Sequence, residues 1–428
     1  MKSATQVIQD ALDSVPVYDP HCHLRPQKPW ADSLADIALY HHVWIELVSS
    51  GLGQTAVTET GLPHEISDPG LPPLERLRRA LPYLPNVRNT TAGLCLRWIL
   101  GDLYGLDGDL NERNLEAAFR AVEEHADSRE WNEHVLRERC RIEYNITVKD
   151  GEPHGPRLLQ GRERIPIHLG GSRWAPHEAL ARYEERFGFP IRNADDYGRL
   201  LAATARAIGK EGLRFIGISL PPTTAPEGAR PEDIDAVIRK ALNREPLSRE
   251  ELGGVSHFAI RRLLQELRAT PLRTVQMLAG AQVLPPHRSL PQWDGGFTGH
   301  LGRLAAEFED FHFNISAASD NYTHDIAVLA KHVPNISVAG HWWHTLYPHY
   351  IRRAIETRID LVPMPKIVAY FSDAYHSEWC YPKLKLIKAI WADVLSERVE
   401  RGWMDTGTAT DLIRAAFWEN PRRIYGGP

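Results

Sequence analysis

The stretch VYDPHCHLRP, residues 17–26, is an apolar run that ends in two histidines one residue apart and then enters a proline-containing loop. Alternate side chains of a strand point to the same side. We therefore expect His21 and His23 to project together from the end of a strand over residues 16–23, with Cys22 facing the other way. Paired imidazoles suit a metal ion. Solvated or capping histidines near a turn would give the same pattern, so the rest of the chain must decide.

Working outward from this stretch, apolar, β-prone runs recur and alternate with helical patterns. Eight strands are expected, and those after the first are RIEYNITV (141–148), RIPIHLGG (164–171), LRFIGISLPP (213–222), LRTVQMLAG (272–280), FHFNISAAS (311–319), NISVAGHWW (335–343) and KIVAYFSDA (366–374). Each is followed by a helix or helical segment, the last by PKLKLIKAIWADVLSERVERG (382–402). This alternation predicts an α/β fold, a (β/α)8 TIM-like barrel. A doubly wound open sheet is the alternative, although neither a GxGxxG nor a P-loop motif supports a nucleotide site.

The segment between the first two strands is longer than a simple strand-to-helix connection. It contains the helical patterns LADIALYHHVWIELV (34–48) and NERNLEAAFRAVEEHADSREWNEHVLRERCR (111–141). We therefore expect three parts. Residues 1–29 form an N-terminal helix and the first barrel strand, residues 30–141 a mainly helical insertion after strand 1, and residues 142–428 the remainder of the barrel.

Composition excludes several classes of function. The chain has 428 residues, of which 43% are hydrophobic and 25% charged, as in ordinary soluble globular proteins. A net charge of −5 gives no basic footprint for nucleic acid or an anionic membrane. No apolar run reaches the roughly 18 residues that span a bilayer. The four cysteines form no CxxC pair, which favours a reducing cytoplasm.

The ends of the predicted strands carry the candidate chemistry, because barrel active sites lie at the carboxyl ends of the strands. Strands 1 and 8 are neighbours in a closed barrel, so Asp373 is expected beside His21 and His23. Two imidazoles and one carboxylate leave open positions for water or substrate, as a catalytic divalent site requires. Zinc is the default ion, with manganese, cobalt or iron as other candidates. Alone, Asp373 could equally be a helix cap.

Other polar groups near strand ends are weaker candidates. His41 and His42, on the predicted insert helix, could transfer protons at the barrel mouth. His341 and His344 flank two tryptophans after strand 7, and one of those tryptophans is expected to pack under a loop. The candidate substrate-binding residues are Arg25, Arg173, Asn321, His341, Trp343 and Tyr375.

Together these residues resemble the amidohydrolase superfamily and, more narrowly, its uronate isomerase (glucuronate isomerase) family. The resemblance covers nearly the whole chain, through YDPHCHL (18–24), the insert with YHH (40–42), ISLPPT (218–223), SDN (319–321), GHWWHT (340–345), FSDAYHSEWCYPK (371–383) and NPRRIYG (420–426). It implies a mononuclear metal site of His21, His23 and Asp373. It also implies interconversion of an aldohexuronate and a ketohexuronate, such as glucuronate and fructuronate. A proton would move between C2 and C1 through a cis-enediol, with Asp373 as a proton-transfer group. His41 matches a family histidine near the substrate.

The sequence departs from the family where specificity should lie. The family usually has His-Tyr in place of His41-His42, Asp-x-Arg in place of Asp373-Ala374-Tyr375, and arginine in place of Ser319. Arginine binds a carboxylate through two parallel charged hydrogen bonds, and neither tyrosine nor serine can do so. Arg173 or Arg25 would have to supply the cation, or the substrate is another sugar acid or a sugar-like compound without that carboxylate.

Two further hypotheses remain open. The chain could be a mononuclear hydrolase or decarboxylase of the superfamily, with His341 or His287 as an extra group. A binuclear hydrolase is disfavoured because strands 4, 5 and 6 lack the Lys and His ligands typical of that group. The third hypothesis is a sugar-binding relative without activity. We expect a small-molecule sugar acid as partner, no nucleic acid or membrane, and association into a homo-oligomer.

Overall fold

The computed structural model describes residues 2–25, 27–126, 128–148, 158–162, 168–169, 175–213, 215–220, 229–280, 294–342 and 346–426. The chain forms two compact units. The first unit comprises Met1–Gln160, Tyr347–Ile355 and Ala369–Pro421, and the second comprises Gly161–Leu346, Glu356–Val368 and Arg422–Pro428.

The first unit is built on a short sheet and a set of helices. Strand β1 (Val17–Asp19) pairs in parallel with β2 (Ile142–Val148), which also lies next to β3 (Leu158–Arg162). Between β1 and β2 the regular structure of the described chain is helical, and loops join the helices. These elements are α2 (Leu34–Ala38), α3 (His41–Ser49), α4 (Pro73–Ala80), η1 (Leu81–Val87), α5 (Thr91–Trp98), η2 (Ile99–Leu103), α6 (Leu115–Glu123), α7 (Arg129–Glu133) and η3 (His134–Arg139).

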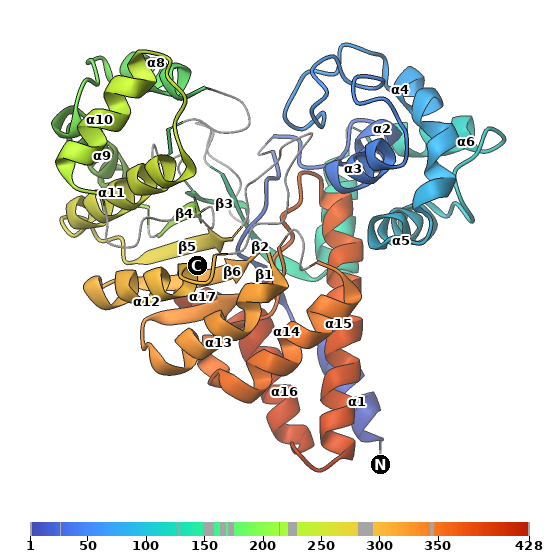
Figure 1. Ribbon diagram of the computed structural model, residues 1–428. Coiled ribbons are helices and arrows are strands. Elements are labelled where there is room, and N and C mark those ends of the chain that lie inside the picture. Colours follow the sequence, from blue (N-terminus) through green and yellow to red (C-terminus); the bar gives the residue numbers. More distant parts are fainter. Residues whose placement is uncertain are drawn as a thin grey trace. The chain divides into compact units, whose positions relative to one another are not determined.

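Helix α15 (Ser377–Glu400) is the central helix of this unit. It is buried on most of its faces and packs against α1 (Ala4–Ser14), α5, η2, η3 and α16 (Thr406–Arg414). Figure 1 shows α1 alongside α15. Both helices were expected from the apolar periodicity, and the structure confirms them. Gly402 follows α15 with φ +70°, a left-handed conformation that suits glycine after a helix end.

The second unit contains a parallel sheet of five strands in the order β4-β5-β6-β7-β8. The strands are β4 (Phe215–Leu220), β5 (Thr274–Ala279), β6 (His312–Ala317), β7 (Ile336–Ala339) and β8 (Ile367–Val368). The helices of this part of the chain are α8 (Pro176–Phe187), α9 (Ala194–Lys210), α10 (Pro231–Leu242), α11 (Arg249–Leu267), α12 (Phe297–Glu307), η4 (Asp320–Tyr322), α13 (Thr323–His332), α14 (Pro348–Leu361) and η6 (Met364–Lys366). α14 begins in the first unit, and the chain ends with η7 (Ala415–Glu419) and α17 (Asn420–Tyr425).

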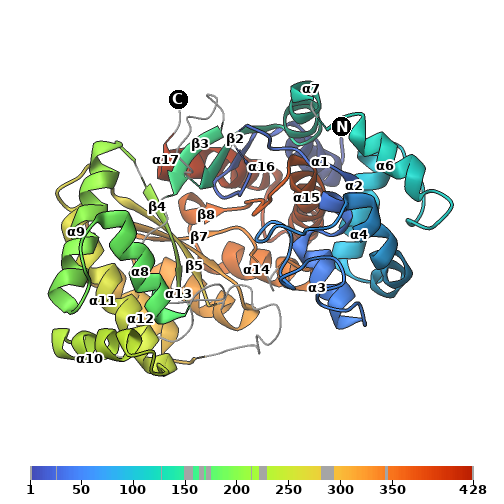
Figure 2. The ribbon, with the colours of Figure 1, turned by 90° about the horizontal axis from the view of Figure 1, so that it is seen from above.

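Helices cover the five-stranded sheet, so its strands are buried. All six residues of β5 are buried, and α13 packs against β6 and β7. Figure 2, seen from above, shows α9, α11 and α12 on the outer side of β4 and β5. Burial on both faces explains why these strands read as continuous apolar runs rather than as alternating ones. The α/β class and parallel pairing that the sequence predicts are confirmed in this unit.

The predicted third strand, residues 164–171, lies mostly outside the described residues, which include only His168 and Leu169 of it. The structure has a strand just before that range, β3 (Leu158–Arg162), which was not expected from the sequence. The run LLQGR has neither alternation nor β-branched residues, so its pattern gave no strand signal. The predicted helix at 34–48 is two helices, α2 and α3, which break at Leu39 and Tyr40. His41 therefore begins a helix.

All four cysteines are buried, and none forms a disulfide. Burial raises the pKa of Cys95 and of Cys140 to about 12, and raises that of Cys380 well above its ordinary value. Among the described residues, no helix has both the length and the apolar character that crossing a bilayer demands.

Candidate metal centre

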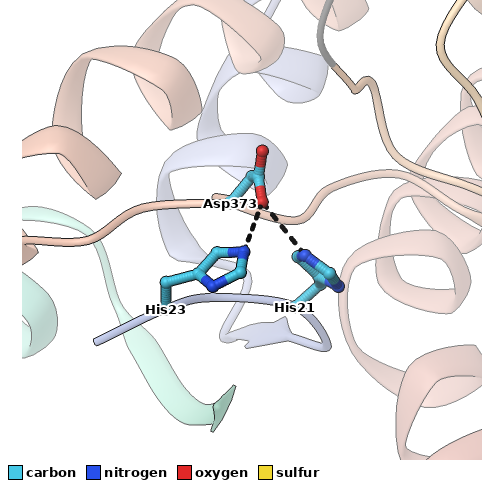
Figure 3. A group of neighbouring side chains, drawn as sticks. All are labelled: His21, His23 and Asp373. Atoms are coloured by element: carbon cyan, nitrogen blue, oxygen red, sulfur yellow. Dashed lines mark hydrogen bonds and ion pairs between the residues drawn. The ribbon is translucent and has the colours of Figure 1, made fainter. Parts of the chain in front are cut away.

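The structure brings His21, His23 and Asp373 together in the first unit. Nε2 of His21 lies 3.0 Å and Nε2 of His23 lies 3.1 Å from the same oxygen, Oδ1 of Asp373 (Figure 3). The two imidazole rings meet edge to face, with centroids 5.3 Å apart. Three donor atoms of the types that bind Zn²⁺ thus converge on one point, and the donor set fits a divalent ion.

Asp19 ties the two chain segments of this cluster together. It ends β1, and its carboxylate accepts hydrogen bonds from Ser372 N at 2.9 Å, Ser372 Oγ at 2.6 Å and Asn145 Nδ2 at 2.8 Å. Backbone bonds from Asp373 N to His21 O and from His23 N to Ala374 O add to this link. Burial raises the pKa of Asp19 to about 6, although the hydrogen bonds from Ser372 and Asn145 act to lower it. The carboxylate therefore fixes the main chain of both segments.

The backbone of Asp373 is held in a rare conformation. Its φ is +48°, in the left-handed region that non-glycine residues seldom adopt. The Tyr40 hydroxyl donates to Asp373 O at 3.0 Å, and the buried Lys383 ammonium donates to Ser372 O at 2.7 Å. These contacts from α15 and from the residue before α3 support the turn that aims the Asp373 carboxylate at the histidines.

Two opposing effects act on the negative charge of the Asp373 carboxylate: burial disfavours the charge, and the imidazoles of His21 and His23 favour it. Burial alone would raise the pKa of Asp373, but the hydrogen bonds and charges of His21 and His23 outweigh it. The pKa of Asp373 is consequently well below its usual range. An ionised carboxylate is the form in which aspartate binds metal or accepts a proton.

Three of the candidate residues form a series of ring contacts that begins at His23. The Tyr375 ring stacks on the His23 ring with centroids 4.5 Å apart and planes 6° from parallel. His41 meets Tyr375 edge to face, with centroids 5.5 Å apart, and contacts the neighbouring His42 ring at 4.1 Å. The backbone N–H of His41 donates to Glu65 Oε1 at 3.2 Å, and its Nδ1 lies 3.8 Å from the same oxygen. Tyr375, His41 and His42 thus form one aromatic group beside the cluster.

The remaining candidates belong to other segments of the chain or fall outside the described residues. Arg25 is exposed and pairs with Asp32 at 3.1 Å. Asn321 and His341 belong to the second unit, where Asn321 is exposed in η4 and His341 is buried after β7. Burial, with the charge of Arg358, holds the pKa of His341 well below its ordinary value. Arg173, His287, Trp343 and His344 fall outside the described residues.

Sequence reasoning missed the supporting residues. Asp19, Tyr40 and Lys383 look like ordinary members of apolar elements, and no motif marks them. His64, Glu65 and His376 form a second buried group close to His41 and Tyr375 in the chain's first unit. The adjacent His-Glu pair in LPHE (62–65) was the available signal, because such neighbours often bind metal or protons.

Comparison of this fold with solved structures gives three close matches. A uronate isomerase from Thermotoga maritima superposes with a TM-score of 0.79 over 99% of this chain and 97% of that one, at 16% identity. The chain has the fold of the uronate isomerases. A uronate isomerase from Bacillus halodurans C-125 matches with a TM-score of 0.75 over 100% and 98% of the two chains, at 17% identity.

A glucuronate isomerase from Caulobacter crescentus gives a TM-score of 0.79 over 99% and 93%, at 15% identity. Identities this low mean that what the chain shares with these uronate isomerases is the fold. No protein-family model matches the sequence. No curated protein matches it either.

Proposed function

We propose that this protein is a metal-dependent aldose–ketose isomerase that acts on a hexuronate, such as glucuronate or fructuronate, or on a related sugar acid. The observation that carries the proposal is the convergence of His21, His23 and Asp373 within a fold shared with uronate isomerases. The departures at Tyr375 and Ser319 leave the exact sugar acid open to experiment.

The proposed architecture is a closed (β/α)8 barrel with a helical insertion after strand 1. The backbone hydrogen bonds between the residues after β1 and those after β8 support closure, because they join the first and last strand segments. The proposed ligands are His21, His23 and Asp373, and the proposed ion is Zn²⁺. When bound, the ion would polarise oxygens of the open-chain sugar and stabilise developing negative charge.

Proton transfer between C2 and C1 needs a base and an acid of the protein. Asp373 is ionised and lies at the cluster, so its carboxylate is the proposed base. His41 is the proposed second proton-transfer group. Glu65 Oε1 accepts its backbone N–H and lies near Nδ1, which orients the ring with Nε2 directed away from Glu65. His42 is the alternative for this role.

The residue content of strands β4, β5 and β6 disfavours a binuclear hydrolase. Their sequences FIGISL, TVQMLA and HFNISA contain no lysine or carboxylate. Gln276 donates to the Tyr425 hydroxyl, and Asn314 contacts Tyr425 and Ser337. His312 stands at the amino end of β6, the end away from the active-site face of a barrel. These side chains support packing within the second unit.

Isotope exchange tests the proposal. Zinc-loaded protein is incubated in D2O with a panel of hexuronates and aldonates, and NMR follows deuterium at C1 and C2 together with the products. An isomerase forms a ketose that carries deuterium at C1 and, by the reverse reaction, an aldose that carries deuterium at C2, without releasing a fragment or carbon dioxide. Release of a fragment or of carbon dioxide would favour a hydrolase or a decarboxylase, and neither ketose formation nor exchange with any hexuronate would favour an inactive sugar-binding relative; either result would reject isomerisation.

A further inference from the structure

A second group of metal-binding side chains lies in the first unit, apart from the cluster of His21, His23 and Asp373. One ligand atom from each of His64, Glu65 and His376 lies within 4.8 Å of the others. His64 and Glu65 come from the loop between α3 and α4, and His376 is the residue before α15. Two imidazoles and a carboxylate are again the donor set of a divalent transition-metal site.

His376 is the strongest sign that something is bound here. Its side chain is buried, and neither ring nitrogen has a hydrogen-bond partner among the described residues. Glu65 Oε2 is likewise buried without a hydrogen bond from the described chain. Leaving a buried polar group without a hydrogen bond is costly, so native proteins rarely leave several together. A ligand between His376 and Glu65 would satisfy both.

His64 is oriented as metal-binding histidines usually are. Its Nε2 lies 3.2 Å from Oδ1 of Asp36, and its Nδ1 lies 3.7 Å from Oε2 of Glu65. Asp36 is itself held, because its Oδ2 accepts the backbone N–H groups of Asp32 and Ser33. A carboxylate behind a histidine fixes the ring and its tautomer, leaving the other nitrogen for the ion. Here that nitrogen is Nδ1, which faces Glu65.

The charges at this group suit a cation. Burial raises the pKa of Glu65, but His64 and His41 outweigh this and lower it to about 2, so the carboxylate is ionised. Burial lowers the pKa of His376 to about 4, so its ring is neutral and keeps a free lone pair. For His64, burial lowers the pKa, but Glu65 and Asp36 outweigh burial and the net shift is upward. A divalent ion would lie between the ionised carboxylate of Glu65 and the neutral ring of His376.

We propose that His64, Glu65 and His376 form a second divalent-cation site, with Zn²⁺ as the ion and Asp36 as the carboxylate that orients His64. The ligand atoms would draw together by roughly 1–1.5 Å, since ligands on a tetrahedral zinc lie about 3.4 Å apart. An ion there links the loop between α3 and α4 to the segment that carries Asp373 and Tyr375. Its role is to fix that segment, and it does not depend on the proposed reaction.

The test counts zinc in full-length protein from which two ligands of the first cluster have been removed. The background variant is His21→Ala/Asp373→Asn. After chelation, loading with zinc and gel filtration, elemental analysis is expected to find one zinc per chain. Adding His376→Ala should reduce this to none. Adding His134→Ala instead should leave one zinc, because His134 belongs to an exposed His–Glu pair on the surface.

Two results would overturn the second site. One is a background variant that retains no zinc, and the other is a zinc count that His376→Ala leaves unchanged. Far-UV circular dichroism of each variant establishes that the chain is folded when the count is made. Because the first cluster is already disabled, the count is independent of whether the protein isomerises uronates.

Discussion

Asp373 has to meet three requirements at once. Its backbone adopts φ +48°, its carboxylate accepts from two imidazoles, and its carbonyl oxygen accepts from Tyr40. The side chain must also stay ionised in a buried place, which the two imidazoles make possible. A change of a single atom in this residue is therefore informative.

Replacing Asp373 with asparagine keeps the shape and the left-handed backbone, which asparagine tolerates, but removes the charge. We expect kcat to fall by about 10²–10⁴-fold, the usual contribution of an acid–base group, and zinc affinity to fall with it. Steady-state kinetics and zinc titration measure both effects. Asp411→Asn, which changes an exposed carboxylate on α16, is the control. An Asp373→Asn protein with full activity would exclude this residue as the base.

Tyr375 stands where the resemblance to the uronate isomerase family leads us to expect an arginine. Its ring stacks on His23, and a planar guanidinium can occupy the same stacked position. A bidentate arginine–carboxylate pair is worth about 1.5–3 kcal/mol, so Tyr375→Arg should raise kcat/KM for glucuronate by about 10–100-fold. Tyr375→Lys, with its single charged point, should gain less. No gain from arginine would mean that the substrate carboxylate binds elsewhere.

The residues that could be predicted from sequence are those that form a short pattern. His21 and His23 stand one residue apart, and Asp373 ends a predicted strand, so barrel topology alone could place them together. His64 and His376 lie in loops without periodicity and more than 300 positions apart, so nothing local related them. Tyr40 and Lys383 each carry one polar group within a mostly apolar segment. Only the folded structure shows which atoms those polar groups contact.

At the scale of elements, α15 does more than fill the core of the first unit. Lys383 reaches from it to Ser372 O, and also lies near the Tyr40 hydroxyl at 3.4 Å. Burial disfavours the charged form of Lys383 and lowers its pKa, so placing this side chain in the interior is energetically unfavourable. The benefit is a fixed carbonyl immediately before Asp373.

Lys383→Met keeps the length of the side chain and removes the hydrogen bonds to that carbonyl. Changes behind a metal ligand typically cost 10–100-fold in metal affinity or activity, and we expect zinc affinity to fall by about that much. Lys385→Met is the matched control, because Lys385 lies on the same helix but is partly exposed and pairs with Asp102. Equal zinc affinities in the two variants would show that Lys383 has no positioning role.

The elements themselves were predictable to different degrees. α1 has a capped amphipathic pattern, α15 is a long apolar-rich pattern followed by a glycine, and strands β4 to β8 are continuous apolar runs, so these elements could be recognised. The break between α2 and α3 was hidden because Leu39 and Tyr40 continue the apolar pattern of the helix. At this break the buried Tyr40 donates a hydrogen bond to the carbonyl oxygen of Asp373, and this tertiary contact overrides the local helix propensity.

At the scale of the whole molecule, histidines that are buried or half-buried contribute to the response to acid. Burial, with the charges of Arg423 and Lys366, lowers the pKa of His312 to about 4. Burial, with Arg261 and His300, lowers that of His257 to about 3. Both rings stay neutral in the folded protein at pH 5, whereas in the unfolded chain they take up protons below about pH 6.5. The unfolded state thus binds more protons, and stability must fall as pH drops from 7 to 5.

His312→Gln should reduce that fall. Its contribution to the difference in unfolding free energy between pH 7 and pH 5 is on the order of 2 kcal/mol. Urea unfolding at the two pH values measures the change. Asp19 acts in the opposite direction, because its pKa is raised to about 6 and ionisation above that pH disfavours the folded state. His324→Gln, an exposed histidine on α13, is the control. The same pH difference in both variants would rule out His312 as a source.

The four buried cysteines have a practical consequence. Only a thiolate attacks oxidants and alkylating reagents or binds metal, and burial raises the pKa values of Cys95, Cys140 and Cys380 far above assay pH. The protein should therefore keep its native state in air without a reducing agent. Zinc titrations can then be run free of dithiothreitol, whose own sulfur atoms would compete for the ion. A cysteine introduced on the surface would be the one group to react with a maleimide dye.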